Sequence, residues 1–248
     1  MSAKVKEILR LLDGIAPFDT AEEWDNVGLL AGHPDTEVDT VYCALDLNEQ
    51  SLNAAIEAGA QLIVTHHPIL FRGRKNLRTD DAEGRLLCAL ARSGLSMIAA
   101  HTNFDAAYPG VNDALAGVLG LTNVRTFDGG LRVGETGGIT LEAFRARTEA
   151  ALGDVVRVYG DPERTIHKVG VLGGSGADFA AAAKAAGADV FVTGEMSYHK
   201  ACDWAADGLC VLEAGHRATE RPAISLLADA LQRAADGVQY NLRIIHEP

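Results

Sequence analysis

Six side chains that could bind a metal ion follow apolar runs of the kind that form buried strands. The run LIVT (62–65) leads directly into two adjacent histidines. Two further apolar runs lead into HTNFD (101–105) and HRATE (216–220), each of which places a carboxylate four residues after a histidine. The six residues are His66, His67, His101, Asp105, His216 and Glu220. Imidazole and carboxylate ligands suit divalent first-row metals, so the pattern favours a metal site.

The spacing of these residues favours two ions. Neighbouring side chains diverge, so His66 and His67 suit one ion each better than a shared one. His216 and Glu220 stand four residues apart and lie on one face if that stretch is helical. Glu220 is the candidate for a bridging carboxylate. Two ions about 3.5–4 Å apart could share a water molecule and convert it to a hydroxide nucleophile.

A purely structural interpretation accounts for each residue taken singly. A buried histidine is often a hydrogen-bonded core residue, and an aspartate before a helix is often its N-cap. Several imidazoles and carboxylates crowded together without a cation would leave buried charge uncompensated, which favours the metal. No cysteine belongs to the set, whereas structural zinc sites usually use cysteine. The four cysteines form no CxxC pair, and we interpret them as structural thiols.

The elements that must position these residues alternate between strands and helices. Such alternation predicts βαβ units with parallel pairing, whose ligands collect at the carboxyl ends of the strands. The predicted strands are 41–45, 61–65, 95–100, 169–172, 189–193, 209–214 and, as an edge strand, 241–245. The predicted helices are 51–59, 82–94, 177–187, 198–208 and 222–234. The fold class is therefore α/β, with two related lobes of mainly parallel sheet flanked by helices.

The two halves of the chain resemble each other. AGAQLIVTHH (58–67) matches AGADVFVTGE (186–195), and each half continues with a helix and a strand that ends in a histidine. Duplication and chance similarity between βαβ units both account for these matches. We expect a first lobe at 1–124, a connecting segment at 125–165 and a second lobe at 166–248, with the lobes forming one structural unit.

Charge and hydropathy exclude several classes of function. The chain has 248 residues and a formal net charge of -12, so general nucleic-acid binding is not expected. No run approaches the roughly 20 apolar residues that cross a bilayer, and the N-terminus lacks the features of a signal peptide. We expect a cytoplasmic protein without a membrane partner.

Six segments resemble the YbgI-like, or Nif-three-like, dinuclear metal-centre proteins, for which the name type 2 GTP cyclohydrolase I is also used. The resemblance covers nearly the whole chain, in its short form without an inserted domain. The segments are AEEWDNVGLLAG (21–32), THHP (65–68), HTNFDAAYPGVNDALA (101–116), GVLGGSGADF (170–179), DVFVTGEMSYH (189–199) and EAGHRATERPAI (213–224).

The resemblance implies the ligand set and the assembly. His67 and Asp105 would hold one ion, His66 and His216 the other, and Glu220 would contact both. The implied assembly is a homo-hexamer with a toroidal cavity. The two divalent ions per subunit could be Zn, Mn, Fe, Ni or Co, because mixed imidazole and carboxylate sites accept several metals.

The expected function is that of a metal-dependent hydrolase. A metal-bound hydroxide would act on a nucleotide, a phosphoester or a cyclic amide C–N bond, and the small-molecule substrate is unknown. The alternative is a non-catalytic hexameric metal-binding scaffold, or a metal storage or sensing protein. His101, Glu195 and His199 are candidates for supporting roles near the metals. His101 could instead be a direct ligand, and Glu195 could instead cap the helix that follows it.

Three further segments have both a structural and a functional interpretation. GGSG (173–176) is a tight turn or a phosphate site, and RGRKNLR (72–78) is a solvated loop or a means of attracting phosphates. WDNVGL (24–29) is expected to pack the start of the first strand, although Trp24 could instead contact substrate.

Overall fold

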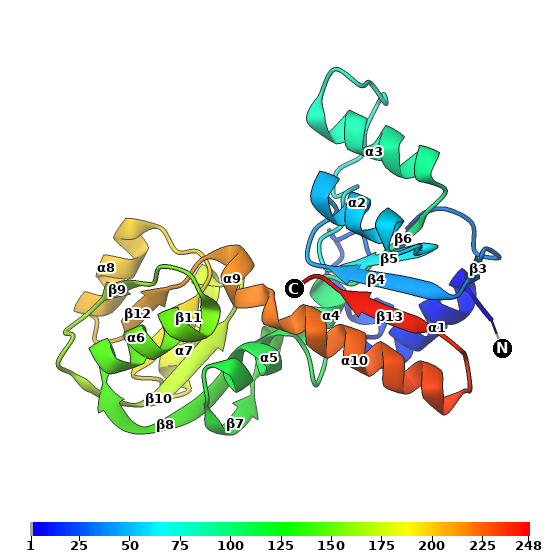
Figure 1. The fold of residues 1–248 in the computed structure, drawn as a ribbon. Helices are drawn as coiled ribbons and strands as arrows, with labels where there is room; N and C mark the ends of the chain where they lie inside the picture. Colours follow the sequence, from blue (N-terminus) through cyan, green and yellow to red (C-terminus); the bar gives the residue numbers. More distant parts are fainter. Residues whose placement is uncertain (1) are drawn as a thin grey trace. The chain divides into compact units, whose positions relative to one another are not determined.

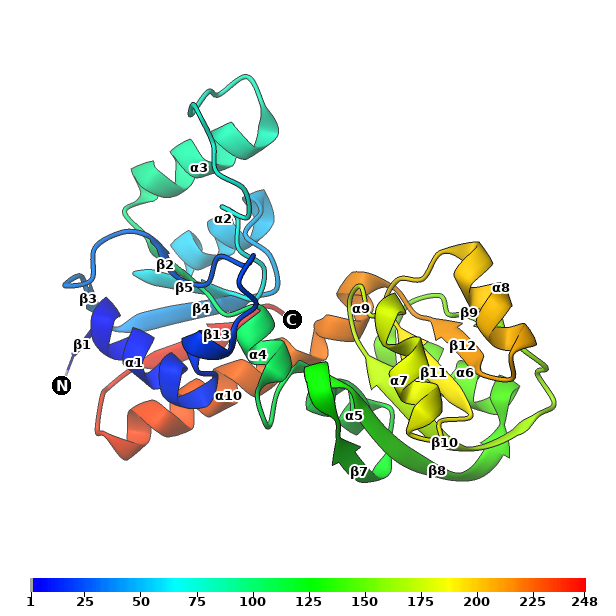
Figure 2. The same cartoon turned by 180° about the vertical axis from the view of Figure 1, so that it is seen from behind.

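A computed structural model describes residues 2–248, and its internal contacts divide the chain into two compact units. Unit 1 comprises the chain up to Ala107 together with Ile224–Pro248, and unit 2 is Tyr108–Ala223. Each unit contains a sheet with helices packed on it (Figures 1 and 2). The expected α/β class with two sheet-containing lobes is confirmed.

The sheet of unit 1 has the strand order β13-β4-β5-β6-β2. β13, β4, β5 and β6 run parallel to one another, and only β2 pairs in the antiparallel direction, with β6. Apolar and β-branched residues dominate β4 and β5, which is typical of strands that are covered on both faces. The bounds are β2 Gly28–Ala31, β4 Thr40–Ala44, β5 Leu62–Thr65, β6 Ser96–Ala99 and β13 Arg243–His246; a small sheet pairs β1 Ala3–Lys4 with β3 Glu37–Val38.

Capping residues mark the ends of two helices of unit 1, α2 and α3. Asn48 accepts the amide of Ser51 at 2.9 Å at the start of α2, and Asp81 accepts the amide of Gly84 at 2.7 Å at the start of α3. Gly94 ends α3 in the left-handed conformation, at φ 75°. The bounds are α1 Val5–Ile15, α2 Glu49–Glu57, α3 Ala82–Ser93 and α4 Thr102–Ala106, with the 3₁₀ turn η1 at Phe18–Thr20.

The sheet of unit 2 has the order β7-β8-β10-β11-β12-β9, with β10, β11 and β12 parallel. The strands are β7 Thr122–Thr126, β8 Arg132–Thr140, β9 Arg157–Tyr159, β10 Thr165–Leu172, β11 Val190–Thr193 and β12 Cys210–Glu213. The helices are α5 Val111–Val118, α6 Leu141–Leu152, α7 Ala180–Ala185, α8 Tyr198–Ala206 and α9 His216–Glu220, with 3₁₀ turns η2 Asp128–Gly130 and η3 Ala177–Phe179. Helix α10, Pro222–Gly237, begins at the boundary between the units.

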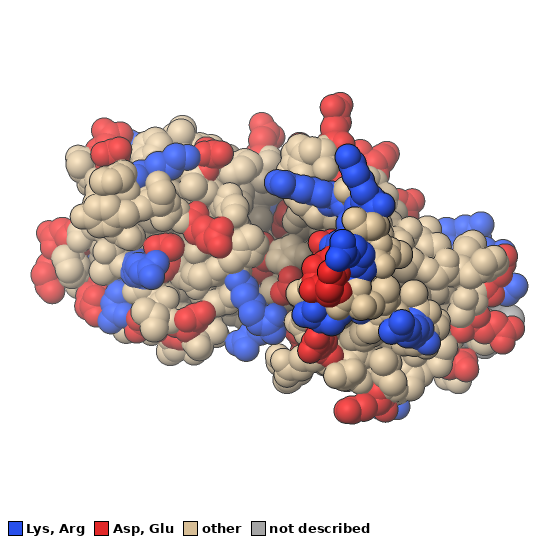
Figure 3. Space-filling view, turned by 90° about the horizontal axis from the view of Figure 1, so that it is seen from above, with Lys and Arg blue, Asp and Glu red and all other residues tan. Residues whose placement is uncertain are grey.

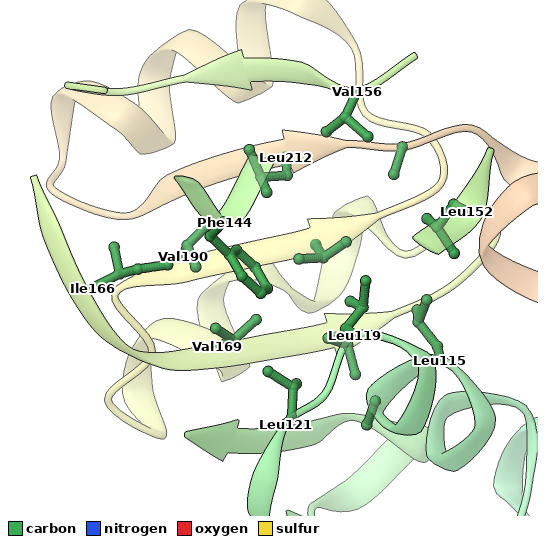
Figure 4. Packing of buried hydrophobic residues seen from close by; sticks show 14 of the residues in the cluster. Leu115, Leu119, Leu121, Phe144, Leu152, Val156, Ile166, Val169, Val190 and Leu212 are labelled. Carbon is green, nitrogen blue, oxygen red and sulfur yellow. The ribbon is translucent and has the colours of Figure 1, made fainter. Parts of the chain in front are cut away.

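Apolar side chains on both faces of the second sheet hold its helices in place. On one face, Phe144 of α6 and Leu115 of α5 pack against Val169, Val190 and Leu212 (Figure 4). On the other face, alanines of α7 and α8 pack against β8, β11 and β12. The central strands β11 and β12 therefore bury both faces, and this fixes the positions at which their carboxyl ends leave the sheet.

The boundaries of the units differ from those expected from the sequence. Residues 125–165 supply β8, β9 and α6 to the sheet and core of unit 2, so they are more than a connecting segment. Residues 224–248 belong to unit 1 because β13 pairs with β4 from Arg243 to His246. Within residues 2–248, no helix combines the length and the apolar character needed to cross a membrane.

Candidate metal site

The parallel strands of unit 1 end at one edge of the sheet, and each is followed by a polar side chain. Asp46 follows β4 by two residues, His66 and His67 come directly after β5, and His101 follows β6 by two residues. Open α/β sheets bind ligands at such an edge. The predicted position of the histidines is therefore confirmed, and the same edge adds Asp46, which we did not predict.

Hydrogen bonds orient the rings of the two adjacent histidines. Nδ1 of His66 lies 2.9 Å from the carbonyl oxygen of Ala100, and Nδ1 of His67 lies 2.8 Å from Oδ1 of Asp46. Both oxygens are acceptors, so Nδ1 is the protonated nitrogen of each ring. In a neutral imidazole the lone pair then lies on Nε2, which becomes the nitrogen that can coordinate a metal.

His101 has the same arrangement, with a carboxylate that is further supported. Its Nδ1 lies 2.9 Å from Oδ1 of Asp25, and Oδ2 of Asp25 accepts the amide and the hydroxyl of Thr102 at 3.1 and 2.6 Å. The side chain of Asp25 is fully buried. Burial alone would raise the pKa of Asp25, but the hydrogen bonds from His101 and Thr102 outweigh it and hold the pKa below its usual value. A carboxylate is therefore kept ionised behind His101.

The three imidazoles lie close together. The ring centroids are 4.9 Å apart for His66 and His67, 5.1 Å for His66 and His101, and 5.4 Å for His67 and His101. Each ring offers a ligand atom, and these atoms lie within 4.8 Å of one another. Metal–nitrogen bonds of about 2.1 Å place two ligands of one ion up to ~4.2 Å apart. Shifts of tenths of an ångström would therefore bring neighbouring rings within the distance at which they can share an ion. Oδ1 of Asp105, in α4, lies 3.7 Å from Nε2 of His66.

Unit 2 presents its own donor pair after β12. His216 and Glu220 lie on α9, and Nε2 of His216 stands 3.2 Å from Oε2 of Glu220, as the i, i+4 spacing predicts. Glu220 is buried, at 5% exposure. Glu195, which follows β11, has a carboxylate oxygen 3.5 Å from Nδ1 of His216 and accepts the hydroxyl of Ser175 at 2.9 Å. Glu195 therefore lies beside His216, and the residue at the N-cap of α8 is Ser197.

The GGSG turn packs against this donor pair. The amides of Gly173 and Gly174 donate to Asn112 Oδ1 at 2.8 Å and to Thr219 Oγ1 at 3.0 Å, and Gly176 donates to Thr193 at 3.1 Å. These amides are occupied within the chain, which supports a structural turn over a phosphate site. Gly174 has φ +59°, and a Cβ there would lie 2.1 Å from Oε1 of Glu220. Glycine at this position leaves room for the Glu220 carboxylate.

Two other predicted features have local contacts of their own. His199 is exposed on α8, and its ring packs against Tyr198. No contact within the described part of unit 2 favours the role near the metals that we considered for it. The basic run 72–78 is partly neutralised within its own loop, because Arg74 pairs with Asp81 and Glu83, and Arg78 pairs with Asp80. Basic and acidic side chains are intermixed on the face shown in Figure 3, in keeping with the net charge of -12.

The two carboxylates behind the histidines were missed for different reasons. Asp46 stands directly beyond a predicted strand, so the reasoning that selected His66 and His67 could have found it. Asp25 precedes His101 by 76 residues and lies in WDNVGL, which we expected to be a packing segment. Its neighbour Trp24 is 60% exposed and does not form part of the core.

Comparisons with known proteins cover nearly the whole chain. The model of the family Duf34/NIF3 (NGG1p interacting factor 3) matches residues 3–247. A Streptomyces coelicolor protein named GTP cyclohydrolase 1 type 2 homolog is 36% identical, over 97% of this chain and 90% of its own length. Among solved structures, Staphylococcus aureus hypothetical protein SA1388 is similar, with a TM-score of 0.95, 30% identity and coverage of 98% of this chain and 96% of that one. The protein ybgI, of unknown function, is similar at a TM-score of 0.87 and 26% identity, covering 99% of both chains.

Proposed function

Because the chain belongs to the Duf34/NIF3 family and has imidazole and carboxylate donors at two sheet edges, we propose that it is a metal-dependent hydrolase with a dinuclear divalent-metal centre. The observation that carries the proposal is the orientation of the histidines in unit 1. Nδ1 of His66 and Nδ1 of His67 are each fixed by an oxygen acceptor, so that Nε2 is the coordinating atom of both rings. A histidine that binds a metal typically donates the hydrogen on its other ring nitrogen to a carboxylate or carbonyl oxygen, as these two rings do.

The proposed ligands follow the family resemblance. His67 and Asp105 would hold one ion, His66 and His216 the other, and Glu220 would be shared. A mixed set of imidazole and carboxylate donors suits divalent first-row metals such as Zn, Mn, Fe, Co and Ni. Five protein ligands for two ions leave coordination positions for water and substrate, which favours catalysis over storage.

The protein groups have separate tasks in the proposed reaction. Bound divalent ions would supply Lewis acidity and lower the pKa of a water molecule. Asp46 holds His67 and Asp25 holds His101, so both rings are oriented before substrate arrives. We place His101 outside the ligand set, as a residue that supports the reacting groups.

The bond that is cleaved belongs to a nucleotide, a phosphoester or a cyclic amide. The name of the Streptomyces coelicolor relative, GTP cyclohydrolase 1 type 2 homolog, makes nucleotides the first class to screen. The screen uses protein loaded separately with each of the five metals. Two bound ions without turnover on any substrate class would support the non-catalytic scaffold, storage or sensing protein instead.

Elemental analysis tests the centre independently of activity. We expect two ions per chain in the reconstituted protein, fewer in Glu220→Gln and His67→Ala, and two in the matched control His246→Ala. His246 is exposed, and its Nδ1 lies 2.7 Å from the carbonyl oxygen of the next residue. His101→Gln should retain both ions and lose turnover. Unchanged metal content in Glu220→Gln would remove that residue from the ligand set.

A substitution behind the ligand gives a graded test. Asp46→Asn keeps the size of the side chain but removes the charge that faces Nδ1 of His67. Loss of such a partner typically weakens metal affinity by about 10–100-fold. A competition titration against a chromophoric chelator measures this change. Equal affinities in Asp46→Asn and the wild type would show that this carboxylate does not act on the metal.

We also propose the homo-hexamer that the family resemblance implies. Three large side chains of unit 2 are strongly exposed and could be covered by other subunits: Tyr108 at 79%, Val155 at 75% and Tyr198 at 64%. Light scattering coupled to size exclusion measures the mass directly. A particle of one or two chains at micromolar concentration would contradict the hexamer.

A further inference from the structure

A cavity of about 950 Å³ lies in unit 1, and two aromatic residues of its lining contact His101. Its apolar lining includes Leu87 and Leu90 of α3 and Leu95, the residue before β6. Trp24 and Phe71 line it as well. The volume is in the range of pockets that hold a nucleotide-sized ligand.

The two aromatic residues form an exposed pair, and a hydrogen bond joins the segments that carry them. Their ring centroids are 5.7 Å apart at an interplanar angle of 70°, and their exposed fractions are 60% for Trp24 and 44% for Phe71. The side-chain amide of Asn26 donates to the carbonyl of Leu70 at 2.6 Å, which ties the segment of Trp24 to that of Phe71. Two large aromatic rings held in water beside a cavity are a surface that a ligand can cover.

The aromatic pair also touches the histidine cluster. The centroid of His101 lies 6.3 Å from that of Trp24 and 6.2 Å from that of Phe71. Asp25, which holds His101, contributes to the wall of the cavity. A ligand seated against the aromatic pair would therefore reach His101, which we propose supports the reacting groups.

The charged residues of the cavity differ in what they can offer a ligand. Arg72 and Lys75 are exposed along its wall. Arg74 is engaged by Asp81 and Glu83. The acidic Asp25 directs both carboxylate oxygens at His101 and Thr102. The charges left to meet a ligand are the two cations, which favour an anionic group.

We propose that this cavity binds the substrate, and that the substrate combines a planar heteroaromatic ring with a phosphate or comparable anionic group. The ring stacks against Trp24 and Phe71, and the anion lies near Arg72 and Lys75. The inference names the substrate class of the proposed hydrolase and rests on that function only for the bond that reacts. Binding in the cavity requires no metal.

Calorimetric titration of the full chain, with metal removed by a chelator and again as purified, tests the inference. The probes are adenosine and guanosine 5′-monophosphates, the corresponding nucleosides, ribose 5-phosphate and inorganic phosphate. Stacking of one base on aromatic side chains corresponds to a factor of about ten or more in affinity. We expect the nucleotides to bind at least about tenfold more tightly than ribose 5-phosphate, and more tightly than the nucleosides. Equal affinities for nucleotide and ribose 5-phosphate, or no heat from any nucleotide at millimolar concentration, would overturn the proposal.

Matched variants assign the binding to this cavity. Phe71→Leu should weaken nucleotide binding about tenfold and leave ribose 5-phosphate unaffected, whereas Phe127→Leu, at an exposed aromatic residue of unit 2, should change neither. Quenching of Trp24 fluorescence by the nucleotide in Trp204→Phe provides a second measurement, since the chain contains two tryptophans. Unchanged nucleotide affinity in Phe71→Leu together with unquenched Trp24 would place the ligand elsewhere. Because the metal-free protein is used, these outcomes are independent of the metal content that tests the proposed centre.

Discussion

Replacement of Asp113 by alanine should destabilise unit 2 strongly, because it leaves a buried guanidinium without its carboxylate. Arg132 is completely buried and donates to both oxygens of Asp113, at 2.9 and 2.7 Å. Its third bond, at 2.8 Å, goes to the carbonyl oxygen of Gly130. Removal of one partner of a buried ion pair typically costs about 3–5 kcal/mol. Asp113 also accepts the amide of Gly110 at the start of α5 at 2.8 Å, so the same change removes a helix cap.

Thermal unfolding followed by circular dichroism measures the effect. For a chain of this length, 1 kcal/mol corresponds to about 2–4 °C in Tm, so Asp113→Ala should melt roughly 6–20 °C below the wild type. The matched control is Asp178→Ala. That carboxylate is 87% exposed and pairs with Lys200 at 2.9 Å, and exposed pairs contribute at most about 1 kcal/mol.

A double variant separates the buried charge from the lost cap. Arg132→Met combined with Asp113→Ala replaces the pair with apolar groups, which is often close to neutral in energy. The double variant should therefore melt above Asp113→Ala, with the remaining deficit due to the cap. Two results would contradict the stabilising role of the buried ion pair. One is a Tm of Asp113→Ala within 2 °C of the wild type. The other is a decrease in Tm for the double variant that equals the sum of the decreases for the two single substitutions.

Two further predictions concern single groups. Burial raises the pKa of Cys43 to about 12, so iodoacetamide at pH 8 should spare Cys43 while it alkylates Cys88 and Cys202, which are partly exposed; peptide mass spectrometry would reveal a modified Cys43 as a contradiction. The backbone hydrogen bond from Gly84, with help from a nearby guanidinium, lowers the pKa of Asp81 below its usual 3.8, so its stabilising effect on α3 is present above that pH and lost as the pH falls through the folded-state pKa. The melting temperature of Asp81→Asn should accordingly fall below that of the wild type near pH 6 and approach it near pH 2, and a pH-independent difference would show that the charge is not involved.

The central strands could be predicted because burial on both faces leaves a plain pattern in the sequence. The short apolar runs predicted as strands at 61–65, 95–100, 189–193 and 209–214 correspond to β5, β6, β11 and β12, and the proposed site residues follow them. Strands β7 and β8 were not predicted. All five residues of β7 are exposed, and the nine residues of β8 include three glycines, so neither strand has an apolar period. A sequence pattern reports burial, and these strands are defined by their hydrogen-bonded partners.

Pairing between distant segments was also beyond the sequence pattern. The edge strand expected at 241–245 is present as β13, but its parallel partner β4 precedes it by about 200 residues. This pairing assigns the C-terminus to unit 1. Asp25 is hidden in the same way, because its role depends on a contact with His101 that no local spacing encodes. The histidines at the strand ends could therefore be predicted from the sequence. The carboxylate that orients His101 could not, because it is distant in the sequence.

The stability of unit 2 and the position of its donors are linked through the start of α5. Asn112, one residue before Asp113, is buried and satisfied on both sides, since its amide donates to Gly130 and its oxygen accepts the amide of Gly173. Gly173 begins the turn whose next residue lies against Glu220. The ion pair that fixes the start of α5 therefore also fixes the turn that leaves room for the Glu220 carboxylate. Asp113→Ala should consequently weaken metal binding as well as lower the Tm, although Asp113 is not among the proposed ligands. A variant that loses thermal stability while its metal affinity is unchanged would break this link.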